Sequence, residues 1–174
     1  MGQCHSNQNN QNNQNNQNNQ NNQNNQNNQN NNLKKKIHYP EHEPRKNTPL
    51  YNHTHHELCI KNDTPCFICN KTRKDDVVTE THHFFCEYAG MNGIDWIEFG
   101  RRAQYLYNPQ TGNNFGKLFN WEQVQKDPSI FVDSQYNMIV LCVEHHRSSN
   151  RGIHHVPFPE WFLQMAPKNG FVFL

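Results

Sequence analysis

The stretch FVDSQYNMIVLCVEHH, residues 131–146, decides how the rest of the chain is organised. Its apolar run after Asn137 is typical of a strand, and Cys142 and His145 follow with the spacing of a metal-ligand pair at the first turn of a helix. The Asn137 side chain both donates and accepts, which suits it to holding a loop or a neighbouring backbone. His146 lies about 100 degrees further around a helix than His145 and therefore faces another direction.

A second ligand pair, Cys66 and Cys69 in the segment CFIC, completes the set that the first pair requires. The thiolates of a Cys-x-x-Cys turn point at one position and are stabilised by backbone N–H groups, which suits tetrahedral Zn²⁺. A structural Zn²⁺ on Cys66, Cys69, Cys142 and His145 would contribute folding free energy directly, since the unfolded chain has no such site. A redox dithiol is the alternative, but the residues after Cys69, NKTRKDD, favour a turn over the strand–helix context of that motif.

Two adjacent histidines lie in TETHHFF, residues 79–85, whose β-branched and aromatic side chains predict a short strand. His82 and His83 point to opposite faces of a regular strand, so both serve one site only at a bulge or a strand end. If they do, His146 is free to join them while His145 binds zinc on the other side. The sequence thus allows a second metal beside the first.

The order of these motifs resembles that of the HNH endonuclease family. THHF contains His82 and His83, Asn137 precedes MIVLC, and His146 ends the third motif, so that the resemblance covers residues 66–164. It implies an α+β fold, a small zinc-stapled ββα-metal domain of treble-clef type with a helical insert. It also implies that His82 and His146 hold a divalent cation, that His83 is the general base and that Asn137 orients this base.

Three features depart from the family pattern. His82 stands where relatives often have Asp, and His145 stands where a Cys is usual. Residues 84–136 form an insert that is longer than the compact family core and that the resemblance does not place.

The chemistry of phosphodiester hydrolysis agrees with these roles. A neutral imidazole such as His83 accepts a proton from water near neutral pH, and a divalent cation stabilises the phosphoryl and leaving oxygens. Mg²⁺ and Mn²⁺ are both candidates, although imidazole ligands favour Mn²⁺ or another transition metal. Arg147 and Arg151 are expected to bind phosphate groups of the substrate, and His154 is expected to contact the substrate or its leaving group.

The insert predicts two helices. Residues 94–106 have amphipathic spacing, and the helix either presents Arg101 to nucleic acid or packs Trp96 inward with its arginines in solvent. Asn120 is the expected N-cap of the second helix, WEQVQK. Asp133, further along, is either a cap or turn former or a residue that assists near the metal.

The sequence divides into a low-complexity N-terminal region and linker, residues 1–62, and a folded domain, residues 63–174. Residues 7–32 are almost entirely Asn and Gln, without an apolar face to bury, and are expected to be disordered. The opening MGQCHS matches the pattern for N-myristoylation of Gly2, with Cys4 placed for a second acyl chain. One myristoyl chain would give only weak membrane attachment.

Composition narrows the functional classes. The net charge of +1 predicts no strong field for nucleic acid, yet the twelve histidines can add positive charge or bind metals. No run of about 18 apolar residues and no apolar signal core occurs, which predicts an intracellular protein of the cytoplasm or nucleus, membrane-associated if Gly2 is acylated. In that reducing setting the six cysteines favour metal ligation over disulfides.

Three functions are therefore expected to compete. The first is a metal-dependent HNH endonuclease that hydrolyses double-stranded DNA. The second is a non-catalytic, zinc-stapled nucleic-acid-binding module, and the third is a membrane-tethered adaptor that acts through an acylated N-terminus. The sequence favours the enzyme, because a pure binding module has no use for His83 and His146 together.

Overall fold

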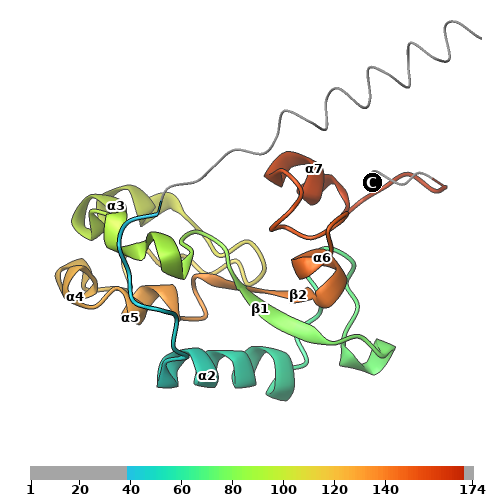
Figure 1. Ribbon diagram of the computed structural model, residues 1–174, viewed down its shortest axis with the longest axis horizontal. Helices are drawn as coiled ribbons and strands as arrows, with labels where there is room; N and C mark the ends of the chain where they lie inside the picture. Colours follow the sequence, from blue (N-terminus) through green and yellow to red (C-terminus); the bar gives the residue numbers. More distant parts are fainter. Residues whose placement is uncertain (1–38, 171–174) are drawn as a thin grey trace, which may run out of the picture. The chain divides into compact units, whose positions relative to one another are not determined.

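A computed structural model describes residues 39–170 (Figure 1). Its helices and strands are, in chain order, α2 (Pro49–His55), a π-helix (His56–Lys61), a 3-10 helix (Arg73–Asp75), β1 (Thr79–His83), a 3-10 helix (Tyr88–Gly93), α3 (Trp96–Arg102), a 3-10 helix (Ala103–Tyr105), α4 (Trp121–Lys126), α5 (Ser129–Val132), β2 (Met138–Cys142), α6 (Val143–Arg147) and α7 (Phe158–Leu163). Gly2, Cys4, the Asn/Gln tract and the terminal FVFL lie outside the described residues. No helix within 39–170 has the length and apolar character needed to cross a membrane.

The centre of the fold is an antiparallel sheet of two strands, β1 and β2, within a mixed arrangement of helices and strands. Thr79 pairs with Cys142 at one end of the ladder and His83 pairs with Met138 at the other. Both predicted strands are confirmed, with ends that differ by one or two residues from those expected. Strand β2 leads directly into α6, so that Cys142 is both the last strand residue and the residue before the helix.

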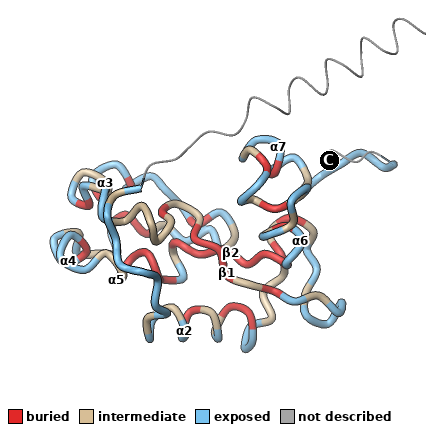
Figure 2. The backbone as a smooth tube through the Cα atoms, in the orientation of Figure 1, coloured by how far each residue is buried: buried red, intermediate tan, exposed pale blue. Residues whose placement is uncertain are grey.

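Strand β2 is buried on both faces, as Figure 2 shows by its red colour. Ile139 and Leu141 join a core that contains the Cys66 turn and Trp161 of α7. The alternate residues Met138 and Val140 pack instead against the π-helix that follows α2. Because successive side chains of a strand point to opposite faces, the run MIVLC supplies two cores at once.

Residues 49–61 are folded, in contrast to the linker that the sequence predicts there. Thr48 accepts a hydrogen bond from the Tyr51 N–H as the N-cap of α2, and Pro49 occupies the first turn, where a missing N–H costs nothing. Leu58 and Cys59 of the adjoining π-helix are buried against β2. The predicted boundary after residue 62 is therefore wrong, because residues 49–61 belong to the folded domain.

The insert between the strands has its own aromatic core, in which Trp96 and Phe131 are fully buried. The helix predicted to begin after Asn120 is confirmed as α4, and Asn120 caps it by accepting from two backbone N–H groups. Helix α3 packs Trp96 inward, and its two arginines pair with Glu98. Of the two arrangements expected for this helix, the structure therefore has the one in which it packs against the core. The insert leaves and rejoins the sheet at neighbouring positions, since the Phe84 N–H donates to the Asn137 carbonyl at 2.7 Å.

Candidate functional site

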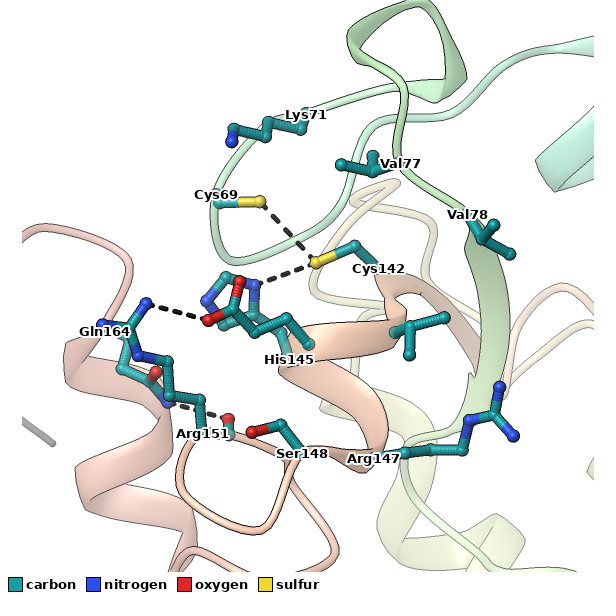
Figure 3. A pocket seen from close by; sticks show the side chains of 12 residues that line it. Cys69, Lys71, Val77, Val78, Cys142, His145, Arg147, Ser148, Arg151 and Gln164 are labelled. Carbon is teal, nitrogen blue, oxygen red and sulfur yellow. Dashed lines mark hydrogen bonds and ion pairs between the residues drawn. The ribbon is translucent and has the colours of Figure 1, made fainter.

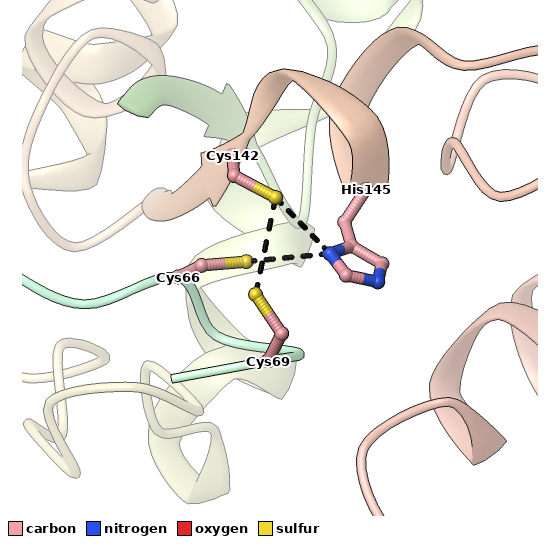
Figure 4. A group of neighbouring side chains, drawn as sticks. All are labelled: Cys66, Cys69, Cys142 and His145. Carbon is pink, nitrogen blue, oxygen red and sulfur yellow. Dashed lines mark hydrogen bonds between the residues drawn. The ribbon is translucent and has the colours of Figure 1, made fainter. Parts of the chain in front are cut away.

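Cys66, Cys69, Cys142 and His145 form one cluster, and their ligand atoms all lie within 4.8 Å of one another (Figure 4). The Cys69 and Cys142 sulfurs are 3.9 Å apart, and His145 Nδ1 lies 3.1 Å from Cys142 Sγ and 3.7 Å from Cys66 Sγ. The structure thus brings the two predicted ligand pairs together across the domain. The cluster can hold a metal ion.

Backbone hydrogen bonds hold this cluster against the sheet. The Phe67 N–H donates to the Val140 carbonyl at 2.8 Å, which fixes the Cys66 turn to the middle of β2. Asn70 adopts a left-handed conformation with φ of 59° and its N–H donates to the Cys66 carbonyl, which closes the turn. On the other side, Trp161 Nε1 donates to the His145 carbonyl at 2.9 Å.

The thiols of the cluster have unequal acidities. A hydrogen bond from Cys142 lowers the pKa of Cys66, and the same bond raises the pKa of Cys142. Burial raises the pKa of Cys69. Because three close thiolates repel one another, a bound divalent cation is what would allow all of them to be deprotonated together.

A second cluster consists of three imidazoles, those of His82, His146 and His154, whose ligand atoms also lie within 4.8 Å of one another. The ring centroids are 5.0 to 5.2 Å apart. His82 is the penultimate residue of β1, His146 belongs to α6, and His154 follows that helix in the chain. His154 was expected to contact substrate, and the structure adds it to the two predicted ligands as a third nitrogen donor.

Desolvation favours the neutral form of these imidazoles, which metal ligation requires, most strongly at buried His82 and least at exposed His154. Desolvation, followed by the charges of His146 and His154, lowers the pKa of His82 to about 2. Burial also lowers the pKa of His146 and that of His154. The Nδ1–H of His146 donates to Glu80 Oε2 at 2.7 Å, which leaves its Nε2 available as a ligand atom.

His83, the last residue of β1, is a fourth imidazole beside this cluster and is 3% exposed. Its Nε2 lies 3.1 Å from Asp133 Oδ1, and its Nδ1 lies 3.8 Å from the Glu87 carboxylate. The other oxygen of Glu87 lies 3.7 Å from His82 Nδ1. Both histidines therefore face the Glu87 carboxylate. They can do so because β1 ends at His83, and a strand end is one of the two irregularities that would let both serve one site.

A cavity of about 260 Å³ is lined by His83 and by all three imidazoles of the second cluster. Its lining also includes the guanidinium-bearing residues Arg45 and Arg147. The Arg45 guanidinium stacks over the Tyr51 ring at 4.7 Å, so the segment before α2 forms part of the wall. The cavity thus contains three imidazoles that can bind a cation and two guanidinium groups that can bind an anion.

Asn137 is fully buried, and all its side-chain bonds go to the backbone. Its Oδ1 accepts from the N–H groups of Phe85 and Cys86 at 3.0 and 3.1 Å. Its Nδ2 donates to the carbonyls of Cys86 and Val132 at 2.9 and 2.8 Å. Asn137 thus holds the loop after β1, and any orientation of His83 by Asn137 is exerted through the backbone.

The two arginines expected to bind phosphate lie around a larger cavity of about 930 Å³ beside the Cys/His cluster (Figure 3). Arg147 lines this cavity and the smaller one, and it also donates to Glu80 Oε1. Arg151 pairs with Glu144 at 3.0 Å. Lys71 adds a third cationic side chain to the same lining.

Sequence reasoning missed the carboxylates Glu80 and Glu87, and it did not place Arg45 and Tyr51 in the cavity wall. Glu80 carries a signal that could have been used, since it lies two residues before His82 on the same strand. Glu87 and Arg45 have no such signal, because the contacts that bring them to the site depend on the tertiary fold. Comparisons with protein-family models, curated proteins and solved structures find no match to this chain.

Proposed function

We propose that this protein is a metal-dependent endonuclease of the HNH type, which hydrolyses phosphodiester bonds of double-stranded DNA. One observation carries the proposal: a cluster of three imidazoles, His82, His146 and His154, shares a cavity with a separate imidazole, His83. Three neutral nitrogen donors suit a cation, and a fourth imidazole that is not part of the set suits a base. In this proposal β1, β2 and α6 are the ββα-metal unit of a treble-clef-like fold.

The ion proposed for the Cys/His cluster is a structural Zn²⁺. Zinc–sulfur distances of about 2.3 Å and zinc–nitrogen distances of about 2.0 Å give sulfur–sulfur separations near 3.8 Å and sulfur–nitrogen separations near 3.5 Å in a tetrahedron. The corresponding separations of 3.9 Å, 3.7 Å and 3.1 Å agree with this geometry within a few tenths of an ångström. Three thiolates and one imidazole form a closed shell, as structural zinc prefers.

The ion proposed for the imidazole cluster is a divalent transition metal such as Mn²⁺, Co²⁺, Ni²⁺ or Zn²⁺. Mg²⁺ prefers oxygen ligands. A site with three imidazoles therefore suits Mg²⁺ even less than a site with two. When bound, a divalent cation supplies Lewis-acid stabilisation to the phosphoryl oxygens and to the leaving oxygen.

The chain's own residues would perform the remaining steps. His83 presents Nδ1 on the cavity side, toward Glu87, where it can accept a proton from the attacking water. Arg147 and Arg45 can bind non-bridging oxygens of the phosphate from the cavity wall. Arg151 and Lys71 can bind neighbouring phosphates in the larger cavity, which Arg147 connects to the smaller one.

The first prediction tests the enzyme directly by incubating supercoiled plasmid DNA with the protein and a panel of divalent cations. His83→Ala is expected to reduce cleavage by about 10²- to 10⁴-fold, since it removes the base, and to leave zinc content unchanged. His53→Ala is the matched control, because His53 is an exposed histidine of α2. Cleavage is followed on gels, and zinc content is measured by elemental analysis.

The outcomes separate the competing functions. If His83→Ala loses zinc or unfolds, His83 belongs to the structural core and the base assignment fails. If the unmodified protein binds DNA but cuts it with none of the cations, it is a binding module.

A further inference from the structure

Asp133 is a buried carboxylate to which the proposed reaction has so far given no role. It is 2% exposed and directly follows α5, with its N–H bonded to the Ser129 carbonyl. Within the described residues, its side chain has two hydrogen-bond partners. The Thr48 hydroxyl donates to Oδ2 at 2.7 Å, and His83 Nε2 lies 3.1 Å from Oδ1. A buried carboxylate needs such donors, because they replace the hydrogen bonds to water that it loses on burial.

The contact with Asp133 decides which nitrogen of His83 carries a proton. An ionised carboxylate only accepts hydrogen bonds, so the bond to Asp133 Oδ1 places the proton on His83 Nε2. A neutral ring then has its lone pair on Nδ1. This nitrogen lies on the side of Glu87, which lines the cavity together with His83. Asp133 therefore selects the tautomer whose free nitrogen faces the proposed substrate.

Glu87 is the alternative residue for orienting His83, but its geometry is poorer. Its oxygen is 3.8 Å from His83 Nδ1, beyond hydrogen-bond distance, whereas Asp133 lies at 3.1 Å. Its side chain is 37% exposed, whereas the Asp133 side chain is 3% exposed. Glu87 also lies on the cavity side of the ring, which the attacking water would have to occupy.

We propose that Asp133 is the positioning residue of His83, holding its ring by Nε2 so that Nδ1 can act as the base, and that Thr48 in turn fixes Asp133. This inference rests on the proposed function. Asp133 touches neither substrate nor metal ligand in this arrangement and acts only through His83.

Asn137 supports the same pair from the backbone. Its Nδ2 donates to the carbonyl of Val132, the residue before Asp133. Its Oδ1 accepts from Phe85 and Cys86, just after His83. Asn137 thus fixes both chain segments that carry the pair, and Asp133 makes the direct contact with the ring.

The proton and electron balance of the step is simple. An O–H bond of water breaks and an N–H bond forms on His83 Nδ1, while the water oxygen bonds to phosphorus and the bond to the leaving oxygen breaks. The leaving oxygen takes its proton from solvent. The Asp133 carboxylate stabilises the resulting imidazolium without accepting its proton.

Two kinetic variants test the pair in the full chain. Asp133→Asn is expected to lower kcat by about 10²-fold or more with little change in KM, because the uncharged amide neither selects the tautomer nor stabilises the imidazolium. Asp127→Asn is the matched control, because Asp127 is an exposed aspartate whose side chain accepts from the Ser129 N–H and does not line the proposed site. Thr48→Val removes the donor to Asp133 and should lower kcat by about tenfold, whereas Thr48→Ser should not.

The deciding readout does not depend on DNA cleavage. In zinc-loaded protein with ¹⁵N-labelled histidine, NMR correlations should show His83 as the Nε2–H tautomer, and Asp133→Asn should remove this preference. An Nδ1–H tautomer in the unmodified protein, or an unchanged tautomer in Asp133→Asn, would overturn the inference. If Asp133→Asn does not fold, the His83 tautomer is compared between Thr48→Val and Thr48→Ser. The Nε2–H preference should weaken in Thr48→Val and persist in Thr48→Ser, and an equal preference in both would overturn the inference. A protein with the expected tautomers but no cleavage would overturn the proposed function and leave the pairing standing.

Discussion

At the scale of single residues, Glu80 links the imidazole cluster to Arg147, one of the arginines proposed to bind phosphate. Its two carboxylate oxygens accept from His146 Nδ1 and from the Arg147 guanidinium. A carboxylate behind a ligand histidine fixes the ring and strengthens its remaining nitrogen as a donor. In the proposed site, Glu80 would therefore orient the His146 ring toward the cation and hold Arg147 in place.

Glu80→Gln tests this role. The amide can still bond to His146 but carries no charge, so we expect the affinity for the activating cation to fall by about 10- to 100-fold. The measurement is cleavage rate as a function of the concentration of added cation. Glu144→Gln is the control, because Glu144 pairs with Arg151 and lines only the larger of the two cavities described. An unchanged cation dependence in Glu80→Gln would contradict the assignment.

At the scale of elements, the segment after α6 depends on a close backbone approach at Gly152. A Cβ atom at this position would lie 2.6 Å from the Ser148 carbonyl oxygen and 2.8 Å from that of His146. Neither backbone atom can move without displacing the end of the helix. The glycine lets the chain turn back so that His154 reaches His82 and His146.

Gly152→Ala is therefore expected to displace His154 and to destabilise the fold by about 1–3 kcal/mol. The cleavage rate should fall even at temperatures well below the melting temperature, where the variant is still folded. A loss of rate there cannot be explained by unfolding. Gly90→Ala is the control, because its added Cβ would meet no atom within 4 Å. Equal activity of the two variants would show that the approach at Gly152 is unimportant for the site.

The elements also show what the sequence can and cannot predict. The strands and α4 were predictable because their signals are local: an apolar run that ends in Cys142, and a capping Asn120. Helix α2 has no such clear signal, because proline disfavours the interior of a helix and Pro49 is tolerated only by lying in the first turn. The role of Asp133 could not be assigned, since its partner His83 lies 50 positions away and only the fold brings them together.

At the scale of the whole molecule, the folded domain needs the segment that precedes the predicted boundary. Leu58 and Cys59 cover one face of β2, and Arg45 and Tyr51 line the smaller cavity. Burial of one such apolar side chain is worth about 1.5–3 kcal/mol, a large fraction of the stability of a small domain.

Two truncated chains test this dependence. A chain that begins at residue 63 is expected to be unfolded or insoluble, whereas one that begins at residue 39 should keep the melting temperature and cleavage rate of the full protein. Circular dichroism and plasmid cleavage are the measurements. Equal melting temperatures for both chains would show that the earlier segment contributes nothing.

The proposed acylation belongs to the part of the chain outside residues 39–170. If Gly2 is myristoylated and Cys4 carries a second acyl chain, the full protein should be recovered in part with cell membranes. Gly2→Ala should then return it to the soluble fraction and abolish labelling by a myristate analogue. Labelling that persists in Gly2→Ala would exclude this N-terminal attachment.

The hydrogen bonds that join Asn137 to residues 84–86, including the one between the Phe84 N–H and the Asn137 carbonyl, have a consequence for how such a protein can diversify. These bonds tie the two ends of the insert together, and the insert in turn holds Glu87 and Asp133 against the histidines at the end of β1. Lengthening a closed loop costs little, only about 0.6 kcal/mol for each doubling. Additional residues could therefore be accommodated at the exposed turn around Gly112, which lies far along the chain from both Glu87 and Asp133, and this turn is a natural point for variation.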